Sequence, residues 1–150
     1  MEIETKHLGA VTVEEKDITR FPQGIPAFEE ERDFVFLPFD DSGSLFIMQS
    51  VQHAHIAFIT ADPFVFFPDY ELEVPDAVTE QLHIENPEQV LVYVTLTLAN
   101  TLEDSTANLQ APLIINVEQK LGKQWPMAQS PYETKHLLFQ RTQKEGTGSC

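Results

Sequence analysis

The sequence predicts an all-β, single-domain fold, an antiparallel barrel-like arrangement of about 8–9 short strands with one or two short helices. The apolar residues recur mostly with a period of two, the spacing that places side chains on one face of a strand. The apolar runs are short and are interrupted by Pro, Gly and Asp, which form turns. A chain of 150 residues fits one domain with a single core.

The strand candidates follow one another along the whole chain. They are residues 10–14, 17–21, 34–37, 45–51, 57–60, 70–74, 90–98 and 113–118. A further strand reaching Gln124 is expected after the last of them, through a turn from Lys120 to Lys123 in which Gly122 adopts a positive φ.

Helical signal is limited to two places. Residues 75–82 begin with a proline and space Val78 and Leu82 four residues apart, the pattern of a short amphipathic helix. Residues 27–33 are compatible with one turn of helix, in which Glu29, Glu30 and Glu31 are expected to lie in solvent.

The charge of the chain is strongly negative. Its net charge is −15, and the 87 residues between Arg32 and Lys120 contain fourteen acids and no Lys or Arg. Direct nucleic-acid binding is not expected, because it depends on cations that neutralise phosphates. A basic protein partner is favoured by this field, although high negative charge also serves solubility alone.

Composition also indicates the compartment and the domain limits. No apolar run approaches the about 20 residues of a membrane helix, and the N-terminus lacks a basic region followed by an apolar stretch. The single cysteine, Cys150, suits a reducing compartment. We expect a cytoplasmic monomer with no cofactor, a barrel domain over residues 1–139, and a mobile tail at 140–150 that has almost no apolar residues.

Residues 69–74 carry the clearest candidate contact surface. Period-two geometry places Tyr70, Leu72 and Val74 on one face of a strand and the acids between them on the other. Such an acidic stripe can dock Lys or Arg of a partner, or it can be the outer face of an ordinary half-buried strand. The candidate partner-binding residues are Phe64, Asp69, Tyr70, Glu71, Glu73 and Asn108.

Residues 105–116 are expected to form a loop that leads into a buried strand. Pro112 can open that strand, since its missing N–H costs little there. Asn108 and Asn116 flank the strand, and their amides commonly hold turn backbone. The loop can alternatively line an interface, which is why Asn108 stands among the candidates.

Catalysis is weakly supported. His53 and His55 would share one face of a strand, and Asp62 makes a three-ligand metal site conceivable, but this spacing alone is a weak signal. The chain has no nucleophile elbow, phosphate loop or dinucleotide motif. Phe64, with its neighbours Phe66 and Phe67, could stack on a ligand, yet core packing is the commoner use of such residues. A metal- or carbohydrate-dependent enzyme is therefore the least favoured class.

Four segments, taken in order, resemble the FliW family of flagellar assembly factors. They are Phe21-Pro22-Gln23-Gly24-Ile25-Pro26-Ala27-Phe28-Glu29, Leu45-Phe46 with Gln49-Ser50-Val51, Asp62-Pro63-Phe64 with Asp69-Tyr70-Glu71, and residues 105–116. The match covers about residues 1–137. Ala27 departs from the family, which usually has Gly there, and the tail after Leu138 matches no family feature.

The resemblance implies an all-β binding protein without catalysis. Members of this family bind newly made flagellin in the cytoplasm, at the helical end segment that later polymerises. When flagellin is exported, the freed factor binds the RNA-binding translational repressor CsrA, and flagellin messenger RNA is translated again. The alternative left open by the residues is a chaperone or adaptor for another basic or helical protein.

Overall fold

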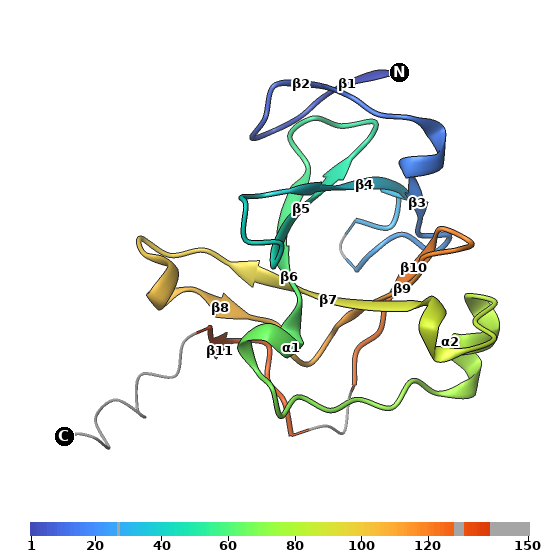
Figure 1. The fold of residues 1–150 in the computed structure, drawn as a ribbon, viewed down its shortest axis with the longest axis vertical. Coiled ribbons are helices and arrows are strands. Elements are labelled where there is room, and N and C mark those ends of the chain that lie inside the picture. The colour runs from blue at the N-terminus through green and yellow to red at the C-terminus, as the bar shows by residue number, and fades with distance from the viewer. Residues whose placement is uncertain (27, 128–130, 139–150) are drawn as a thin grey trace.

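The fold is a closed β-barrel, seen here in a computed structural model that describes residues 1–26, 28–127 and 131–138. The strand order within the barrel is β7-β6-β5-β4-β3-β10-β9, and β9 pairs again with β7 to close it (Figure 1). The all-β, barrel-like class predicted from the sequence is confirmed. The barrel strands are β3 (Thr19–Arg20), β4 (Asp33–Pro38), β5 (Leu45–Ser50), β6 (Ala57–Ala61), β7 (Val90–Thr97), β9 (Leu113–Asn116) and β10 (Leu121–Gln124).

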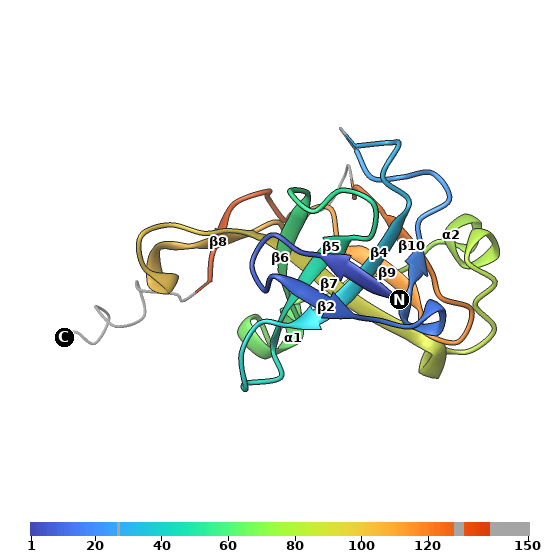
Figure 2. The same cartoon turned by 90° about the horizontal axis from the view of Figure 1, so that it is seen from above.

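Shorter strands and helices lie outside the barrel. A hairpin of β1 (Glu2–Glu4) and β2 (Ala10–Thr12) covers one side, where Ile3 and Val13 pack on Val35 of β4 (Figure 2). The far end of β7 continues beyond the barrel as an arm with β8 (Thr106–Ala107) and β11 (His136–Leu137). The helical elements are α1 (Pro63–Phe66), α2 (Asp76–Gln81) and the 3-10 turns η1 (Glu15–Asp17), η2 (Pro87–Gln89) and η3 (Leu102–Asp104).

The pairing is antiparallel with one exception. β10 lies parallel to β3, joined at Leu121 and Arg20. These two strands are far apart in the chain, so no hairpin imposes an antiparallel direction on them. This one parallel pairing lies within the otherwise antiparallel barrel that the sequence predicted.

The inside of the barrel is filled by aromatic and aliphatic side chains, among them Phe21, Phe34 and Met48, all fully buried. Gly122 lies within β10, and a Cβ there would stand 2.6 Å from the ring of Phe21. The predicted positive φ at Gly122 is therefore wrong, because the residue with positive φ is Lys120, at 58°. Gly122 is required for space and not for a turn.

The two helix predictions had different outcomes. Residues 75–82 contain α2, and Val78 and Leu82 pack on Ile114 of β9, as the spacing indicated. Residues 28–33 form no helix, because Ile25 and Phe28 pair in an isolated bridge that folds the chain back on itself. Ala27, where the family usually has Gly, lies outside the described residues, as does the expected mobile tail at 140–150.

Glu31 was expected in solvent and is instead buried. Its Oε1 accepts a hydrogen bond from Ser50 Oγ at 2.6 Å, and its Oε2 lies 2.7 Å from His53 Nδ1. The carboxylate tolerates burial because both oxygens have partners. It ties the turn before β4 to the end of β5.

Residues 70–74 were predicted to be a strand, and this is wrong. Of the strands that the structure describes, none pairs with this segment. Side chains hold it in place: the Tyr70 hydroxyl donates to the Leu109 carbonyl at 2.7 Å, and the Glu71 N–H donates to the Tyr132 hydroxyl at 2.8 Å. Alternating polarity shows which side chains face the core, but a ladder also needs a neighbouring strand edge.

Candidate protein-binding surface

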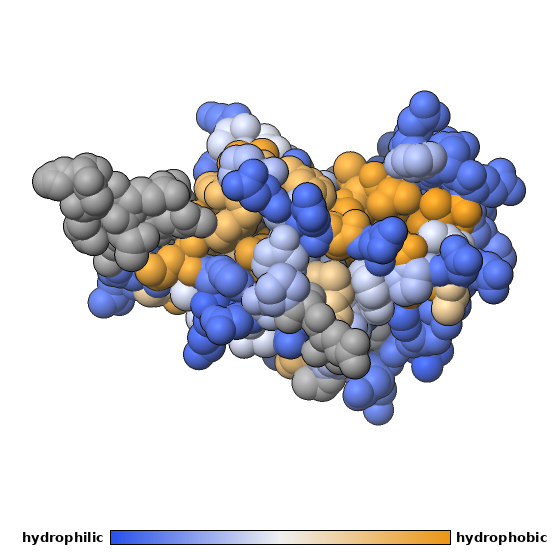
Figure 3. Space-filling model, turned by 90° about the horizontal axis from the view of Figure 1, so that it is seen from below, coloured by the Kyte–Doolittle hydropathy of each residue, from blue (hydrophilic) through white to orange (hydrophobic). Residues whose placement is uncertain are grey.

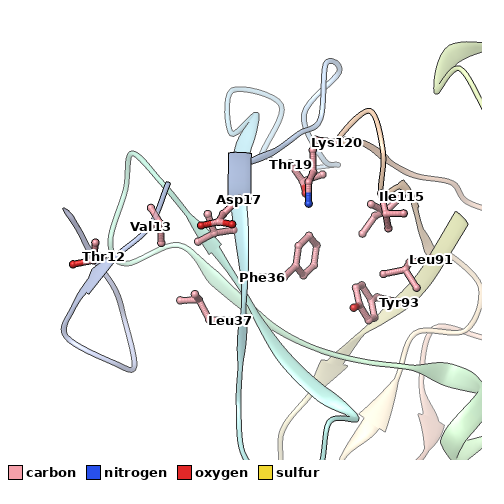
Figure 4. A pocket seen from close by; sticks show the side chains of 12 residues that line it. Thr12, Val13, Asp17, Thr19, Phe36, Leu37, Leu91, Tyr93, Ile115 and Lys120 are labelled. Atoms are coloured by element: carbon pink, nitrogen blue, oxygen red, sulfur yellow. The ribbon is translucent and has the colours of Figure 1, made fainter. Parts of the chain in front are cut away.

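An apolar groove opens at the mouth of the barrel. Its first part is a cavity of about 320 Å³ into which β4, β7 and β9 direct Phe36, Leu91, Tyr93 and Ile115 (Figure 4). Polar side chains from the N-terminal segment and the β9–β10 turn, including Lys120, border it. Apolar side chains of the barrel therefore line a space that is open to solvent.

The groove continues towards α1. A second cavity of about 360 Å³ shares Leu91 and Tyr93 with the first and extends to Phe46, Asp62 and Phe64. The Tyr93 ring forms the floor, with ring centroids 5.2 Å from Phe36 and 5.3 Å from Phe46. We call the surface lined by Phe36, Leu91, Tyr93, Ile115 and Phe64 the barrel-mouth groove.

Two large apolar residues of this groove are exposed to solvent. Leu91 and Phe64 each keep 44% of their area accessible. Leu91 is exposed because the alternate residues of β7, Val90 and Val92, turn to the other face and pack against α2. Apolar residues also gather in patches on the underside of the molecule (Figure 3). Exposed apolar area of this kind is typical of a protein-binding site.

Local sequence explains how α1 presents Phe64. The Asp62 carboxylate accepts a hydrogen bond from the Phe64 N–H at 2.9 Å, and Pro63 occupies the first helical position. The helix is only one turn long, so Phe64 and Val65 face outward while Phe67 turns to the interior. This helix was not predicted, although Asp62-Pro63 is a helix-start signal.

The acidic residues predicted to form a stripe do lie together on the surface. Asp69, Glu71 and Glu73, here named the acidic edge, are exposed. Tyr70 between them is buried. A further open cavity is lined by Phe64, Tyr70, Glu71, Leu72 and Glu73, so the acidic edge borders the α1 end of the groove. Within the described chain, no ion pair involves the three acids.

Asn108, the remaining candidate, is used within the fold. Its Oδ1 accepts hydrogen bonds from the backbone N–H groups of Gln110 and Ala111, both at 3.1 Å. It holds the turn before β9 and does not line the cavities with Phe64 or Glu71. The turn-forming role weighed for Asn108 from the sequence is confirmed, while a role in binding stays a prediction.

Burial controls the ionisation of the two tyrosines at this surface. Desolvation, with a smaller contribution from Tyr132, raises the pKa of Tyr70 well above its usual value. Desolvation and the nearby Asp62 carboxylate raise the pKa of Tyr93. Both side chains are neutral phenols near neutral pH, and the negative charge of the surface comes from carboxylates.

The histidine pair considered as metal ligands is arranged differently from the prediction. The rings of His53 and His55 pack edge to face with centroids 6.1 Å apart, and His53 Nδ1 contacts Glu31. The Asp62 carboxylate caps α1 by accepting the Phe64 N–H. Among residues 1–26, 28–127 and 131–138, no three His, Cys, Asp or Glu side chains are grouped as metal ligands.

Phe64 and the acidic edge were predicted from the sequence as contact residues, and the structure places them on the surface. Leu91 was not predicted, because it lies in a run of apolar residues typical of a buried strand. Its exposure depends on the position of the barrel mouth, which the local pattern does not encode. Of the helices in the described part of the chain, none is long and apolar enough to cross a membrane.

Comparisons with known proteins agree over nearly the whole chain. The family model for the FliW protein matches residues 2–138. A flagellar assembly factor FliW from Geobacillus sp. strain WCH70 is 48% identical over 139 residues, covering 93% of this chain and 96% of that protein. The corresponding factor from Bacillus velezensis is 43% identical over 150 residues, with both chains covered completely.

A solved structure supports the same assignment. The crystal structure of a flagellar assembly factor FliW superimposes with a TM-score of 0.89 at 45% sequence identity, covering 93% of this chain and 98% of that one. The chain belongs to the FliW family of flagellar assembly factors.

Proposed function

We propose that this protein is a non-catalytic cytoplasmic factor that binds flagellin before export and, once released, binds and antagonises the translational repressor CsrA. The observation that carries the proposal is an exposed apolar groove bordered at one end by acids that form no ion pair with any described residue. The groove and the acids favour two chemically different partners. Membership of the FliW family supports a role in flagellar assembly.

Flagellin is assigned to the barrel-mouth groove. An amphipathic helix binds by inserting apolar side chains into such a groove at intervals of three to four residues. Leu91 and Phe64 supply exposed apolar contacts at two points along it, and Tyr93 supplies a rigid floor. The helical end segment of flagellin has the required chemistry, because it packs against other helices after export.

CsrA is assigned to the acidic edge. A protein that holds RNA carries basic surface. The three exposed carboxylates have no cationic partner within the described part of the chain, so they attract such a surface. The same negative field disfavours RNA phosphates near the bound repressor. Antagonism therefore does not require this protein to copy the RNA contacts.

The test is a binding assay with purified flagellin and CsrA, separately and in competition. Leu91→Asp should weaken flagellin binding by at least roughly ten-fold, since a buried contact is replaced by a charge. Leu98→Asp is the matched control, because Leu98 is 45% exposed and follows β7 on the arm away from the groove. Equal loss in both variants, or no binding of either partner by the unmodified protein, would contradict the proposal.

A further inference from the structure

An aromatic cavity next to the acidic edge is distinct from the barrel-mouth groove. It is an open space of about 660 Å³ lined by rings from two segments of the chain, with one carboxylate at its border. Its size falls within the range of ligand-binding pockets. Its walls include Phe67, Asp69, Tyr70, Tyr132 and His136.

The rings pack on one another in a fixed arrangement. Tyr132 meets Tyr70 edge to face, with centroids 4.7 Å apart and planes at 62°. His136 contacts Tyr132 at 6.1 Å and Phe67 at 6.3 Å, again edge to face. Tyr70 and Phe67 are buried behind, while Tyr132 and His136 are half-buried at the cavity wall. The cavity therefore offers aromatic surface that is accessible and preorganised.

Backbone hydrogen bonds lock the walls together. The Tyr132 hydroxyl accepts the Glu71 N–H, and the Tyr70 hydroxyl donates to Leu109. His136 Nε2 accepts the Glu133 N–H at 2.8 Å, which holds the imidazole ring at the cavity wall.

The charge distribution of the aromatic cavity favours a cationic ligand. The faces of aromatic rings carry partial negative charge, and Asp69 adds a full charge at the border. Among the described residues that line the cavity there is no Lys or Arg, and the nearby Glu71 reinforces the field. An anion or an acidic peptide would be repelled by this environment.

We propose that the aromatic cavity binds an arginine side chain presented by a partner protein, with the guanidinium stacked on the Tyr132 ring and paired with Asp69. Arginine fits better than lysine, because its planar group stacks on a ring while donating two hydrogen bonds to a carboxylate. The site goes beyond the proposed function, since it specifies one side chain and its test uses neither flagellin nor CsrA.

The test is an NMR titration of the full chain with Nα-acetyl-arginine amide and with its uncharged near-isostere, Nα-acetyl-citrulline amide. The arginine probe should shift the resonances of Tyr132 and His136 and bind at least about five-fold more tightly than the citrulline probe. Asp69→Asn should reduce this preference, and because Asp69 is exposed the variant keeps its fold. Tyr132→Phe should retain arginine binding and Tyr132→Leu should lose it.

Phe28→Leu is the matched control, because Phe28 is an exposed aromatic residue that packs on Phe58 away from the cavity. It should leave both titrations unchanged. Equal affinity for the two probes would show an apolar site without charge selection and would overturn the proposal. The absence of any shift at the highest soluble concentration of the arginine probe would overturn it as well.

Discussion

Asn116 shows how much of this fold depends on one buried side chain. It is fully buried at the end of β9, and its Nδ2 donates to the carbonyls of Leu82 and His83 at 2.8 and 3.1 Å. Its Oδ1 accepts the N–H groups of Glu118 and Gln119. A single amide thus joins the end of α2 to the β9–β10 turn, and both border the barrel.

Replacing Asn116 should be costly. Asn116→Ala leaves buried backbone groups without partners and should lower the free energy of unfolding by about 2–4 kcal/mol. Asn108→Ala is the matched comparison: Asn108 is half-buried and its side chain accepts two bonds, so about 1 kcal/mol is expected. Urea unfolding of both variants measures the difference, and equal losses would contradict this account.

Tyr70 should make stability depend on alkaline pH. Its pKa is raised in the folded state and ordinary, near 10, in the unfolded state. Below pH 10 the Tyr70 hydroxyl keeps its proton in both states, and its contribution to the free energy of unfolding is fully present. As the pH rises above it, only the unfolded state loses the proton, so stability falls by up to about 1.4 kcal/mol per pH unit for each such group.

Tyr70→Phe removes this titration. The variant should be less stable at neutral pH, because the hydrogen bond to Leu109 is lost. Its stability should nevertheless decline less steeply in alkali. Urea unfolding at several values between about pH 9 and pH 11 tests this. Tyr93→Phe should flatten the curve in the same direction, and parallel curves for all three proteins would argue against buried tyrosines as the cause.

At the scale of elements, residues 69–74 show the side-chain alternation of a β-strand without the pairing that normally accompanies it. The alternation of buried and exposed side chains is present: Tyr70 faces the core and the acids face solvent. The backbone pairing of a β-ladder is missing among the described strands. Hydrogen bonds that involve the hydroxyls of Tyr70 and Tyr132 hold the segment instead. An acidic surface on an unpaired segment can be altered without disturbing a sheet.

Reversing one charge on this segment should therefore affect binding and not stability. Glu71→Lys should weaken CsrA binding by about three- to ten-fold, since a favourable charge contact becomes repulsive. The melting temperature should stay nearly unchanged, because the side chain is exposed. Glu88→Lys on η2 makes the same charge change at another exposed position. An unaltered CsrA dissociation constant for Glu71→Lys would remove the acidic edge from the proposal.

For the whole molecule, the net charge of −15 predicts how the two partners respond to salt. CsrA affinity should fall roughly ten-fold between low and physiological ionic strength, because screening weakens the attraction of exposed charges. Flagellin affinity should change much less, since burial of apolar area is not screened. Isothermal titration across a salt series measures both, and a flat CsrA response would count against electrostatic docking.

The sequence by itself determined the all-β class, most of the strands, α2 and the negative field, because side-chain periodicity and charge are local properties. Only the tertiary structure decided the rest. Closure through the β7–β9 pairing placed Leu91 at an open mouth, and contact with Ser50 and His53 drew Glu31 into the interior. The aromatic cavity joins Tyr70 to Tyr132, 62 positions along the chain. Such contacts depend on which distant segments the barrel brings together, and no local pattern encodes that.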